Sequence, residues 1–402
     1  MTAERLVYLP SSMRTFAIAG AVVLASLAVA AAPPPLPAPD YRIYVASESG
    51  DIVSQLTWDG TTLKTVKTVP VGIIGASGYS GLEASRILAA HPQVELKLLG
   101  SDKWAGQTAA RRAGLSGAAG KLKYVPQEQV AQLARECAAV LLATPAEGSL
   151  KLVPILHALG VRVIDLSGAF RLRDASLYPK FYGFEHLHKN LISQAFYGLP
   201  ELSRTPAGAR LIANPGCYAT AAALALAPLI ESGAVEGPFI VDAASGVTGA
   251  GRKATEDLSF AEVDEDFRAY RVLRHQHQPE IAQTVGRDVT FTAHLLPLKR
   301  GILATCYSRL KGKADLKEIF LHKYASAPFL EVLDSPDQVS LKGVVGTNKC
   351  QVAVASDGET VIAISAIDNL VKGAAGQAVQ NLNLAMGWSE TAGLDTLRGF
   401  QP

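Results

Sequence analysis

Apolar and polar residues alternate with two different periods between residues 70 and 170. Short apolar runs of strand length occur at Val71–Ile74 and in "VELKLLG", "AAVLLATP" and "VRVIDLSG". Between them lie segments whose apolar residues recur with a helical period, from about Ser80 to Ala90 and in "EGSLKLVPILHALG". Strands that alternate with helices predict a parallel, doubly wound sheet. We therefore expect an α/β fold of the Rossmann type.

The first of these strands runs into a glycine-rich turn, "GASGYSG". Glycines let the backbone turn tightly and approach a pyrophosphate, and the helix that follows offers unpaired N–H groups. The spacing is G-x-x-G-x-x-G rather than the usual G-x-G-x-x-G, and close packing also explains such turns. The flanking strands favour a dinucleotide site, for which the candidate residues are Gly75, Ser77, Gly78, Tyr79, Ser80 and Gly81.

The end of the second strand bears on the choice between NAD and NADP. An acidic residue here usually binds the ribose 2′-OH, whereas a serine and a base can hold a 2′-phosphate. Asp102 therefore favours NAD, and Ser101 with Lys103 favours NADP. The residues alone favour NADP slightly. The Thr144-Pro145 turn ends a later strand at the edge where such sheets bind ligands, so we expect it to contact the cofactor.

A cysteine in "NPGCYATAAALAL" is the first candidate for chemistry. Cys217 follows a Pro-Gly turn and begins an alanine-rich helical pattern. A helix N-terminus lowers a thiol pKa, so the position predicts an activated nucleophile. A buried helix-capping cysteine explains the residue equally well. The other cysteines, Cys137, Cys306 and Cys350, form no CxxC pair, so we predict neither a metal site nor a disulfide scaffold.

The stretch "LRHQHQPEI" offers a partner for this thiol. Histidine transfers protons near neutral pH. His275 and His277 are two residues apart and would share a face in an extended segment. Glu280 is placed to orient an imidazole. A metal site built on His-x-His is the alternative, but a complete ligand set is not evident.

Two further stretches suit anionic groups. The loop "SGVTGAGRKA" combines the donors of Ser245 and Gly246 with the charges of Arg252 and Lys253, as a phosphate or carboxylate site requires. An ordinary surface loop is the alternative. Arg171 in "DLSGAFRLRD" is placed to fork onto a substrate carboxylate, or else is an exposed structural arginine. The net charge of +2 shows no general attraction to nucleic acid.

The two ends of the chain differ from its middle. Residues 13–30, "MRTFAIAGAVVLASLAVA", look like a secretory signal, and a proline-rich linker follows. Alternating residues around Asp59-Gly60 predict a β-hairpin within residues 41–69. We interpret residues 1–69 as an appendage, with a genuine targeting segment as the alternative. Near the other end, "SAIDNLVKGAAGQAVQNLNLAMGW" predicts a strand and then a long helix that returns to the nucleotide domain.

These motifs in this order resemble the N-acetyl-gamma-glutamyl-phosphate reductases, NADP-dependent enzymes of arginine biosynthesis within the aspartate-semialdehyde dehydrogenase-like superfamily. The matching stretches are "GIIGASGYSGLE", "YGLPEL", "NPGCYAT", "SGVTGAGRKA", "HQHQPEI" and "IDNLVKGAAGQAVQN". The resemblance implies a Rossmann domain over residues 70–216, an α+β catalytic and dimerisation domain over 217–368, and a returning C-terminal helix over 369–402. It also implies NADP, a cytoplasmic homodimer or homotetramer, and a small-molecule acyl phosphate as substrate.

The resemblance assigns roles residue by residue. It implies that Cys217 is the nucleophile, that His277 is the acid/base with His275 in reserve, and that Asn369 contacts the cofactor. We also expect substrate contacts from Arg171, Asn214, Arg252, Lys253 and His275, cofactor contacts from Ser245 and Gly246, and a catalytic role for Glu280. The reaction implied is NADPH-dependent reduction of N-acetyl-glutamyl 5-phosphate through a cysteine thioester. The alternatives are an aminoadipyl or aspartyl phosphate as substrate, or a non-catalytic secreted binding protein.

The chain departs from the family pattern at two places. Ala169 stands where the family has an acid, and Ala146-Glu147 replace an expected His-Gly pair. Both changes lie near expected ligand positions, so both bear on how the substrate is held.

Overall fold

The computed structural model describes residues 41–47, 52–58, 63–65, 68–395 and 397. The chain divides into two units, Met1–Thr68 and Val69–Pro402. In the first unit the strands β1 (Tyr41–Ser47), β2 (Ile52–Trp58) and β3 (Leu63–Thr65) form an antiparallel sheet in that order. The strands on either side of Asp59-Gly60 therefore pair as the hairpin prediction requires. The signal-like stretch 13–30 and the proline-rich linker lie outside the described residues.

The second unit begins with a six-stranded parallel sheet in the order β5-β4-β6-β7-β9-β8. This confirms the predicted Rossmann-type sheet. The strand order reverses between β4 and β6, where doubly wound sheets bind ligands. The strands are β4 (Val69–Ile74), β5 (Val94–Gly100), β6 (Ala139–Leu142), β7 (Arg162–Asp165), β8 (Phe196–Tyr197) and β9 (Leu211–Ala213).

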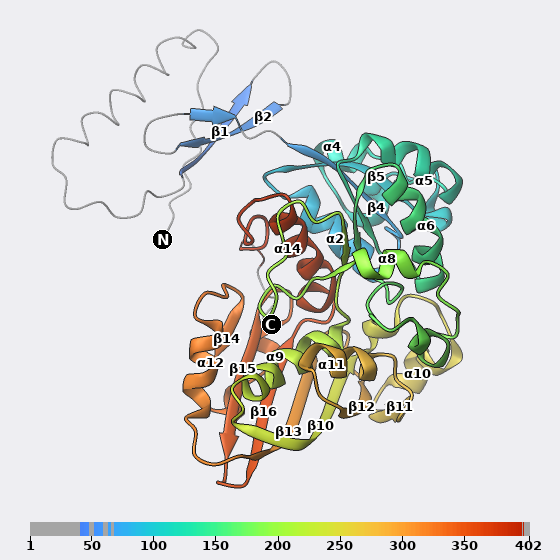
Figure 1. Cartoon of the computed structure of the whole chain (residues 1–402). Coiled ribbons are helices and arrows are strands. Elements are labelled where there is room, and N and C mark those ends of the chain that lie inside the picture. The colour runs from blue at the N-terminus through green and yellow to red at the C-terminus, as the bar shows by residue number, and fades with distance from the viewer. Residues whose placement is uncertain (1–40, 48–51, 59–62, 66–67, 396, 398–402) are drawn as a thin grey trace, which may run out of the picture. The chain divides into compact units, whose positions relative to one another are not determined.

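Helices cover both faces of this sheet (Figure 1). The central strand β6 is buried along its whole length, as expected for a parallel strand between two helical layers. The helices are α2 (Tyr79–Ala89), α3 (Ala109–Ala113), α4 (Gly117–Lys121), α5 (Gln127–Leu133), α6 (Ala146–Ala158), α7 (Tyr178–Tyr182) and α8 (Lys189–Gln194). A 3₁₀ turn, Asp102–Trp104, follows β5.

A seven-stranded mixed sheet in the order β11-β12-β10-β13-β16-β15-β14 forms the other half. Its strands are β10 (Val235–Gly246), β11 (Arg268–Tyr270), β12 (Val289–Leu296), β13 (Ile302–Leu310), β14 (Leu330–Val332), β15 (Cys350–Ser356) and β16 (Thr360–Ile367). Burial alternates along β12 and β13, because one face of the sheet meets the helices α9 (Cys217–Glu231), α11 (His277–Val285) and α12 (Leu316–Tyr324). The short helices α10 (Phe260–Val263) and α13 (Leu341–Val344) lie in connections.

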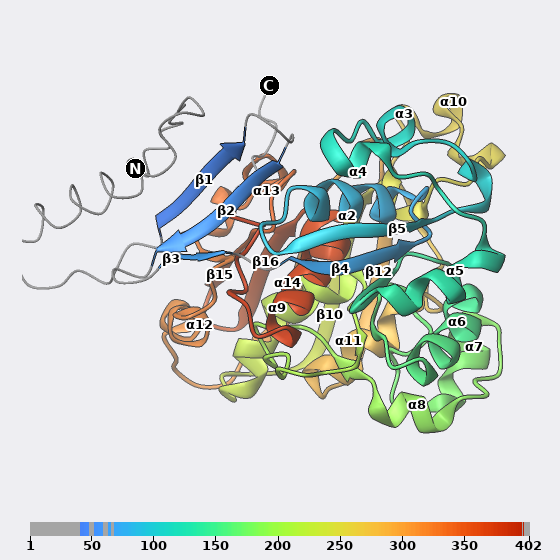
Figure 2. The ribbon, with the colours of Figure 1, turned by 90° about the horizontal axis from the view of Figure 1, so that it is seen from above.

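The chain then returns to the first sheet. After β16 comes a π-helical turn, Val371–Ala375, and then α14 (Gly376–Ala385), which lies beside α2 in Figures 1 and 2. Val379 and Leu382 of α14 share one apolar cluster with Val71 and Ile87. The predicted long helix is therefore interrupted at its start, where Ala375 N–H bonds the carbonyl of Leu370 five residues earlier. Among the described residues, no helix has the length and apolar character needed to cross a membrane.

Candidate active site

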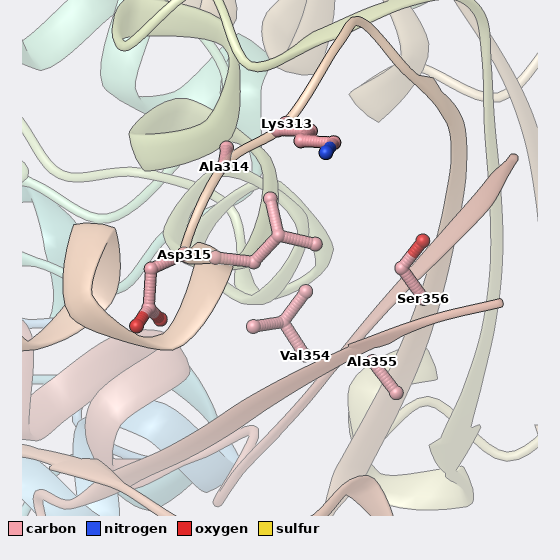
Figure 3. Close-up of a pocket in the computed structure, with 7 residues that line it drawn as sticks. Lys313, Ala314, Asp315, Val354, Ala355 and Ser356 are labelled. Carbon is pink, nitrogen blue, oxygen red and sulfur yellow. The ribbon is translucent and has the colours of Figure 1, made fainter. Parts of the chain in front are cut away.

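A cleft of about 670 Å³ lies between the two sheets. It gathers predicted residues from both halves of the chain: Tyr79, Ser80, Thr144, Pro145, Arg171, Cys217, Arg252, Lys253, His277 and Asn369. The remaining predicted residues do not line it: Gly75, Ser77, Gly78, Gly81, Ser101, Lys103, Asn214, Ser245, Gly246, His275 and Glu280. A separate hollow beside α12, between Lys313 and Ser356, contains none of the predicted residues (Figure 3).

The turn between β4 and α2 needs glycine at two positions. Gly75 has a φ of +84°, and a Cβ there would lie 2.4 Å from the carbonyl oxygen of Ala143. A Cβ on Gly81 would lie 2.3 Å from the carbonyl oxygen of Gly75. The backbone is therefore closed tightly against the start of α2, as a pyrophosphate cradle requires. Ser101 Oγ donates a 2.8 Å hydrogen bond to Ser77 Oγ, which ties the end of β5 to this turn.

The residues that bear on the choice between NAD and NADP differ in how near they lie to the nucleotide turn. The carboxylate of Asp102 accepts a 2.6 Å hydrogen bond from the N–H of Gln127, the first residue of α5, so the group that favoured NAD is engaged elsewhere. Lys103 is exposed in the same 3₁₀ turn and lies outside the cleft lining. Arg252 reaches this region instead, because its Nη1 donates to the carbonyl of Ser77 over 3.1 Å and its guanidinium lies 4.9 Å from the ring centre of Trp104.

Cys217 is the first residue of α9, directly after the N-cap Gly216. Burial raises the pKa of its thiol to about 11, although Arg171 and the N–H groups of Tyr218 and Cys217 lower it in part. The prediction of a lowered thiol pKa is therefore wrong for this structure. The helix terminus is present as predicted, but the removal of the thiolate from water outweighs it.

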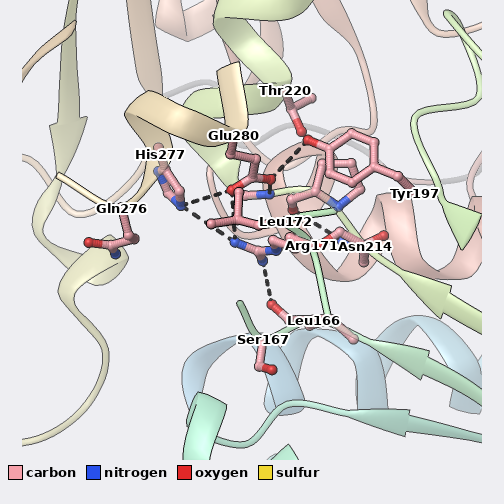
Figure 4. Close-up of polar contacts among 12 residues, drawn as sticks. Leu166, Ser167, Arg171, Leu172, Tyr197, Asn214, Thr220, Gln276, His277 and Glu280 are labelled. Atoms are coloured by element: carbon pink, nitrogen blue, oxygen red, sulfur yellow. Dashed lines mark hydrogen bonds and ion pairs between the residues drawn. The ribbon is translucent and has the colours of Figure 1, made fainter. Parts of the chain in front are cut away.

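A buried carboxylate organises the residues next to Cys217 (Figure 4). Glu280 Oε1 accepts a 2.7 Å hydrogen bond from Gly216 N–H and a 2.9 Å bond from the hydroxyl of Tyr197. Its Oε2 lies 3.5 Å from Arg171 Nη1 and 3.9 Å from His277 Nε2. Glu280 therefore holds the turn before the cysteine as well as the neighbouring cation and imidazole.

Arg171 and Asn214 are both hydrogen-bonded within the protein, and of the two only Arg171 also lines the cleft. Arg171 Nε donates to the carbonyl of Asn214 over 2.8 Å and Nη2 donates to Leu166 O over 2.6 Å. These two bonds leave Nη1 and the second N–H of Nη2, and Arg171 lines the cleft, so its contact with a substrate carboxylate stays a prediction. Asn214 is wholly buried, with Asn381 Nδ2 donating to its Oδ1 and its own Nδ2 donating to Ala374 O, so it has no surface for a substrate.

The two histidines lie beside each other, with ring centres 4.9 Å apart, but in different surroundings. His277 begins α11, so the segment is helical from this residue and not extended as predicted. His275 is enclosed by the rings of Tyr218, Tyr270 and Phe291, and its Nδ1 accepts the N–H of His277. Burial lowers the pKa of His275 to about 2, and burial with the charges of Arg171 and Arg271 lowers that of His277 well below its usual range. Only His277, as a neutral imidazole, faces the cleft.

The loop that carries Arg252 and Lys253 is fixed by hydrogen bonds at its beginning. Ser245 is buried, and its Oγ donates to the carbonyl of Gly246 over 3.0 Å. Asn369 Oδ1 accepts the N–H of Gly301 over 2.8 Å, and its Nδ2 donates to Thr248 Oγ1 over 2.9 Å. Ser245 and Gly246 therefore support the loop, while its later residues, with Arg252 and Lys253, line the cleft.

Known proteins with similar sequences identify the family. Residues 70–208 match the semialdehyde dehydrogenase NAD-binding domain, and residues 217–369 match the semialdehyde dehydrogenase dimerisation domain. An N-acetyl-gamma-glutamyl-phosphate reductase of Dehalococcoides mccartyi is 44% identical over 83% of this chain and 99% of its own length. That of Nitrosospira multiformis is 42% identical over 82% and 99%. The chain belongs to the N-acetyl-gamma-glutamyl-phosphate reductase family.

Solved structures of more distant proteins share the fold. Aspartate semialdehyde dehydrogenase II from Vibrio cholerae superposes with a TM-score of 0.61 at 19% identity, over 79% of this chain and 98% of that one. The enzyme from Candida albicans superposes with a TM-score of 0.57 at 15% identity, over 80% and 99%. These likenesses agree with the arrangement of a parallel sheet and a mixed sheet described above.

Several residues that line the cleft of this reductase were not predicted from the sequence, and three of them bear on its chemistry. Arg271 lines it, has a φ of +47°, and donates from Nη1 to Gln276 Oε1 over 2.8 Å. Tyr182 lines it, and its hydroxyl oxygen is buried without a hydrogen-bond partner. Gly373 lies against the thiol-bearing residue, because a Cβ there would be 2.7 Å from Cβ of Cys217. Arg271 could have been found from the sequence as a positively charged residue close to the histidines. Tyr182 and Gly373 have no such signal in the sequence around them.

The two departures from the reductase pattern fall at different depths. Ala169 is fully buried, does not line the cleft, and its carbonyl is within 2.8 Å of His186 Nε2. Ala146 and Glu147 begin α6 and do line the cleft. The second departure is therefore the one placed to touch a ligand.

Proposed function

We propose that this reductase converts N-acetyl-glutamyl 5-phosphate and NADPH into N-acetyl-glutamate 5-semialdehyde, phosphate and NADP. The observation that carries the proposal is the meeting of Cys217 and His277 in one cleft with the Tyr79–Ser80 start of the nucleotide-loop helix. The reductases that it resembles at 42–44% identity over nearly their full lengths support the same substrate.

In this reaction Cys217 is the nucleophile. Its sulfur attacks the acyl carbon, phosphate leaves, and a thioester joins the substrate to the enzyme. His277, which is a neutral imidazole lining the same cleft, accepts the thiol proton as the carbon–sulfur bond forms. Bound NADPH supplies the hydride that reduces this thioester carbon. The resulting thiohemiacetal collapses as its carbon–sulfur bond breaks, which releases the semialdehyde, and the proton held by His277 returns to the sulfur of Cys217.

The raised pKa of the Cys217 thiol makes such a base necessary, whereas the lowered pKa of His277 weakens the imidazole as that base until the anionic substrate offsets its arginine neighbours. A thiol with a pKa of about 11 is almost wholly protonated near neutral pH, so attack requires a base to remove the proton as the carbon–sulfur bond forms. Arg171 and Glu280 act by position. They hold Asn214 O and Gly216 N–H on either side of the turn that presents Cys217.

The phosphate and carboxylate groups of the substrate bind the positively charged side chains that line the cleft. Arg252 and Lys253 approach from the loop after β10, and Arg271 approaches from the segment before α11. Phosphate is held by the loop cations, and the substrate carboxylate is held by Arg171 or Arg271, which both line the cleft.

The chain carries a semialdehyde dehydrogenase type of NAD(P)-binding domain. NADP is the cofactor of our proposal, held by the loop Gly75–Gly81 with Thr144, Pro145 and Asn369. Ser101, which is bonded to this loop, and Lys103 beside it are proposed to face the 2′-phosphate, and Arg252 adds the cation that reaches the loop. We propose residues 70–216 as the nucleotide domain, 217–368 as the catalytic and dimerisation domain and 369–402 as the returning segment. The active form is a cytoplasmic homodimer or homotetramer, in keeping with the matched dimerisation domain.

The reaction run backwards tests the proposal. The full chain is assayed for phosphate-dependent reduction of NADP with N-acetyl-glutamate 5-semialdehyde, beside the aminoadipate and aspartate semialdehydes. We expect activity with the first substrate that vanishes in Cys217→Ser and persists in Cys306→Ser, whose cysteine is buried in the core of the second sheet. Activity only with another semialdehyde would reassign the substrate, and activity retained by Cys217→Ser would remove the proposed nucleophile.

A further inference from the structure

Helix α14 carries side-chain amides into the interior of the protein. Gln377, Gln380, Asn381 and Asn383 all lie in this helix and are fully buried. A buried amide is costly unless its donors and acceptors are hydrogen-bonded. The partners of these amides therefore show what the helix holds in place.

Two of the partners lie on either side of Cys217. Asn381 Nδ2 donates to Asn214 Oδ1 over 2.9 Å, and Gln377 Nε2 donates to Thr220 Oγ1 over 3.0 Å. Asn214 is three residues before the cysteine and Thr220 is three residues after it. The amides therefore hold both the turn that enters α9 and the first turn of the helix.

A third contact falls on the cysteine itself. Gly373 belongs to the π-helical turn before α14, and a Cβ at this position would lie 2.7 Å from Cβ of Cys217. Positions 373, 377 and 381 are spaced by four residues, so they follow one side of the segment. This stripe, Gly373–Gln377–Asn381, thus lies along the whole thiol-bearing turn.

The hydrogen bonds of Asn381 fix which way its side-chain amide faces. Its Oδ1 accepts a 2.6 Å hydrogen bond from Thr205 Oγ1, which leaves Nδ2 to donate to Asn214 Oδ1 and to Gly198 O over 2.8 Å. Gly198 has no room for a side chain, since a Cβ there would lie 2.6 Å from the Asn381 amide. The orientation of this amide is therefore fixed by protein groups on both sides.

We propose that Asn381 and Gln377 are positioning residues that fix Cys217 in its place opposite His277. The inference rests on the proposed function, in which Cys217 is the nucleophile. Loss of either amide frees one end of the turn, so the thiol is presented less often at the distance that attack requires. Neither amide lines the cleft, so cofactor binding is left unchanged.

The test compares amides of one helix that have different partners. Asn381→Ala and Gln377→Leu remove the contacts beside Cys217. Asn383→Ala is the matched control, because Asn383 is equally buried but its Nδ2 donates to Ala392 O over 2.9 Å. For each full-length variant we measure kcat, the KM for NADPH, Tm, and the rate at which iodoacetamide alkylates Cys217.

The expected result separates position from stability. Because misplacing a reacting group by about 1 Å costs up to about 100-fold in rate, Asn381→Ala should lower kcat at least about tenfold and change the alkylation rate by a similar factor. Its KM for NADPH should stay at the wild-type value. Asn383→Ala should lower Tm while kcat and alkylation stay at wild-type values.

Equal losses of kcat in Asn381→Ala and Asn383→Ala would overturn the proposal, as would a wild-type alkylation rate in Asn381→Ala. If Asn381→Ala does not fold, Gln377→Leu decides by the same measurements. If the wild-type enzyme does not reduce the acyl phosphate, the proposed function fails, and the alkylation rates alone decide whether α14 positions the thiol.

Discussion

Glu280 Oε1 lies 2.7 Å from the backbone nitrogen of Gly216, the residue directly before Cys217, and accepts its hydrogen bond. The same carboxylate faces Arg171 and His277 through its other oxygen. A side chain that the sequence placed beside a histidine thus fixes the backbone that carries the thiol. The carboxylate is inaccessible to solvent, so its charge interacts strongly with these few groups.

Replacing this carboxylate should reduce turnover. In Glu280→Gln one oxygen remains for Gly216 N–H, but the amide nitrogen faces Arg171 Nη1, a donor. We expect the turn to shift and kcat to fall at least about tenfold, because small displacements of reacting groups cost that much. Steady-state kinetics checks this, with Glu359→Gln at an exposed strand end as the control. An unchanged kcat in Glu280→Gln would contradict the positioning role.

The reactivity of Cys217 should rise steadily with pH. Its thiol pKa is about 11, so between pH 7 and 10 each pH unit increases the reactive thiolate about tenfold. The rate of alkylation by iodoacetamide should therefore increase without a plateau over this range. Cys217→Ser supplies the background from Cys137 and Cys350, whose pKa values burial raises to about 11 and about 12. A plateau below pH 8 would mean that the thiol is ionised in the resting enzyme.

Acid should destabilise the fold through its buried histidines. The folded-state pKa of His275 is lowered to about 2 and that of His277 is also lowered, so their stabilising contribution is present above pH 6.5 and is lost as pH falls below it. Between pH 6 and 5 His275 should lower the free energy of unfolding by about 1.4 kcal/mol per pH unit, and His277 should add to the loss in the same direction. Urea unfolding measures this slope, and His275→Phe should reduce it by about one histidine's share.

The buried pair Lys372–Glu201 should tolerate double replacement better than single replacement. Lys372 Nζ donates to Glu201 Oε1 over 2.6 Å, and both side chains are inaccessible to solvent. Lys372→Met leaves an unpaired buried carboxylate and should lower the free energy of unfolding by about 3–5 kcal/mol, whereas adding Glu201→Gln should restore much of it. Urea unfolding of the single and double variants checks this.

The exposed pair Lys317–Asp334 serves as the control for that cycle, since its side chains are 45% and 78% accessible. Lys317→Met should leave the unfolding midpoint almost unchanged. If Lys372→Met also left the unfolding midpoint unchanged, the buried pair would make no net contribution to the stability of the protein.

The parts of the site that the sequence predicted have local signals. The β4–α2 turn shows itself as three glycines, each three residues after the last, between an apolar strand and a helical pattern. Cys217 shows itself as a cysteine after a Pro-Gly turn and before an alanine-rich helix. The start of α11 also had a local signal, because Pro279 is tolerated only in the first turn of a helix.

The parts that were missed depend on partners distant in the chain. Two N–H groups of Arg171 donate to the carbonyls of Leu166 and Asn214. The side chain of Asn214 in turn accepts a hydrogen bond from an amide on α14. His275 does not line the cleft, because it packs against the rings of Tyr218 and Phe291, and only the folded sheet brings these rings near it. Burial likewise reversed the expected thiol pKa, since desolvation depends on the whole surrounding core.

The return of α14 to the first sheet sets the order in which a ribosome can complete this enzyme. The nucleotide half is synthesised first, yet part of the cover for Val71, Ile73 and Ile87 comes from the last helix of the described chain. Until that helix has emerged, the nascent sheet carries an apolar face that holdase chaperones recognise. A polypeptide stalled before Gly376 would contain Cys217 and His277 and still leave this face open.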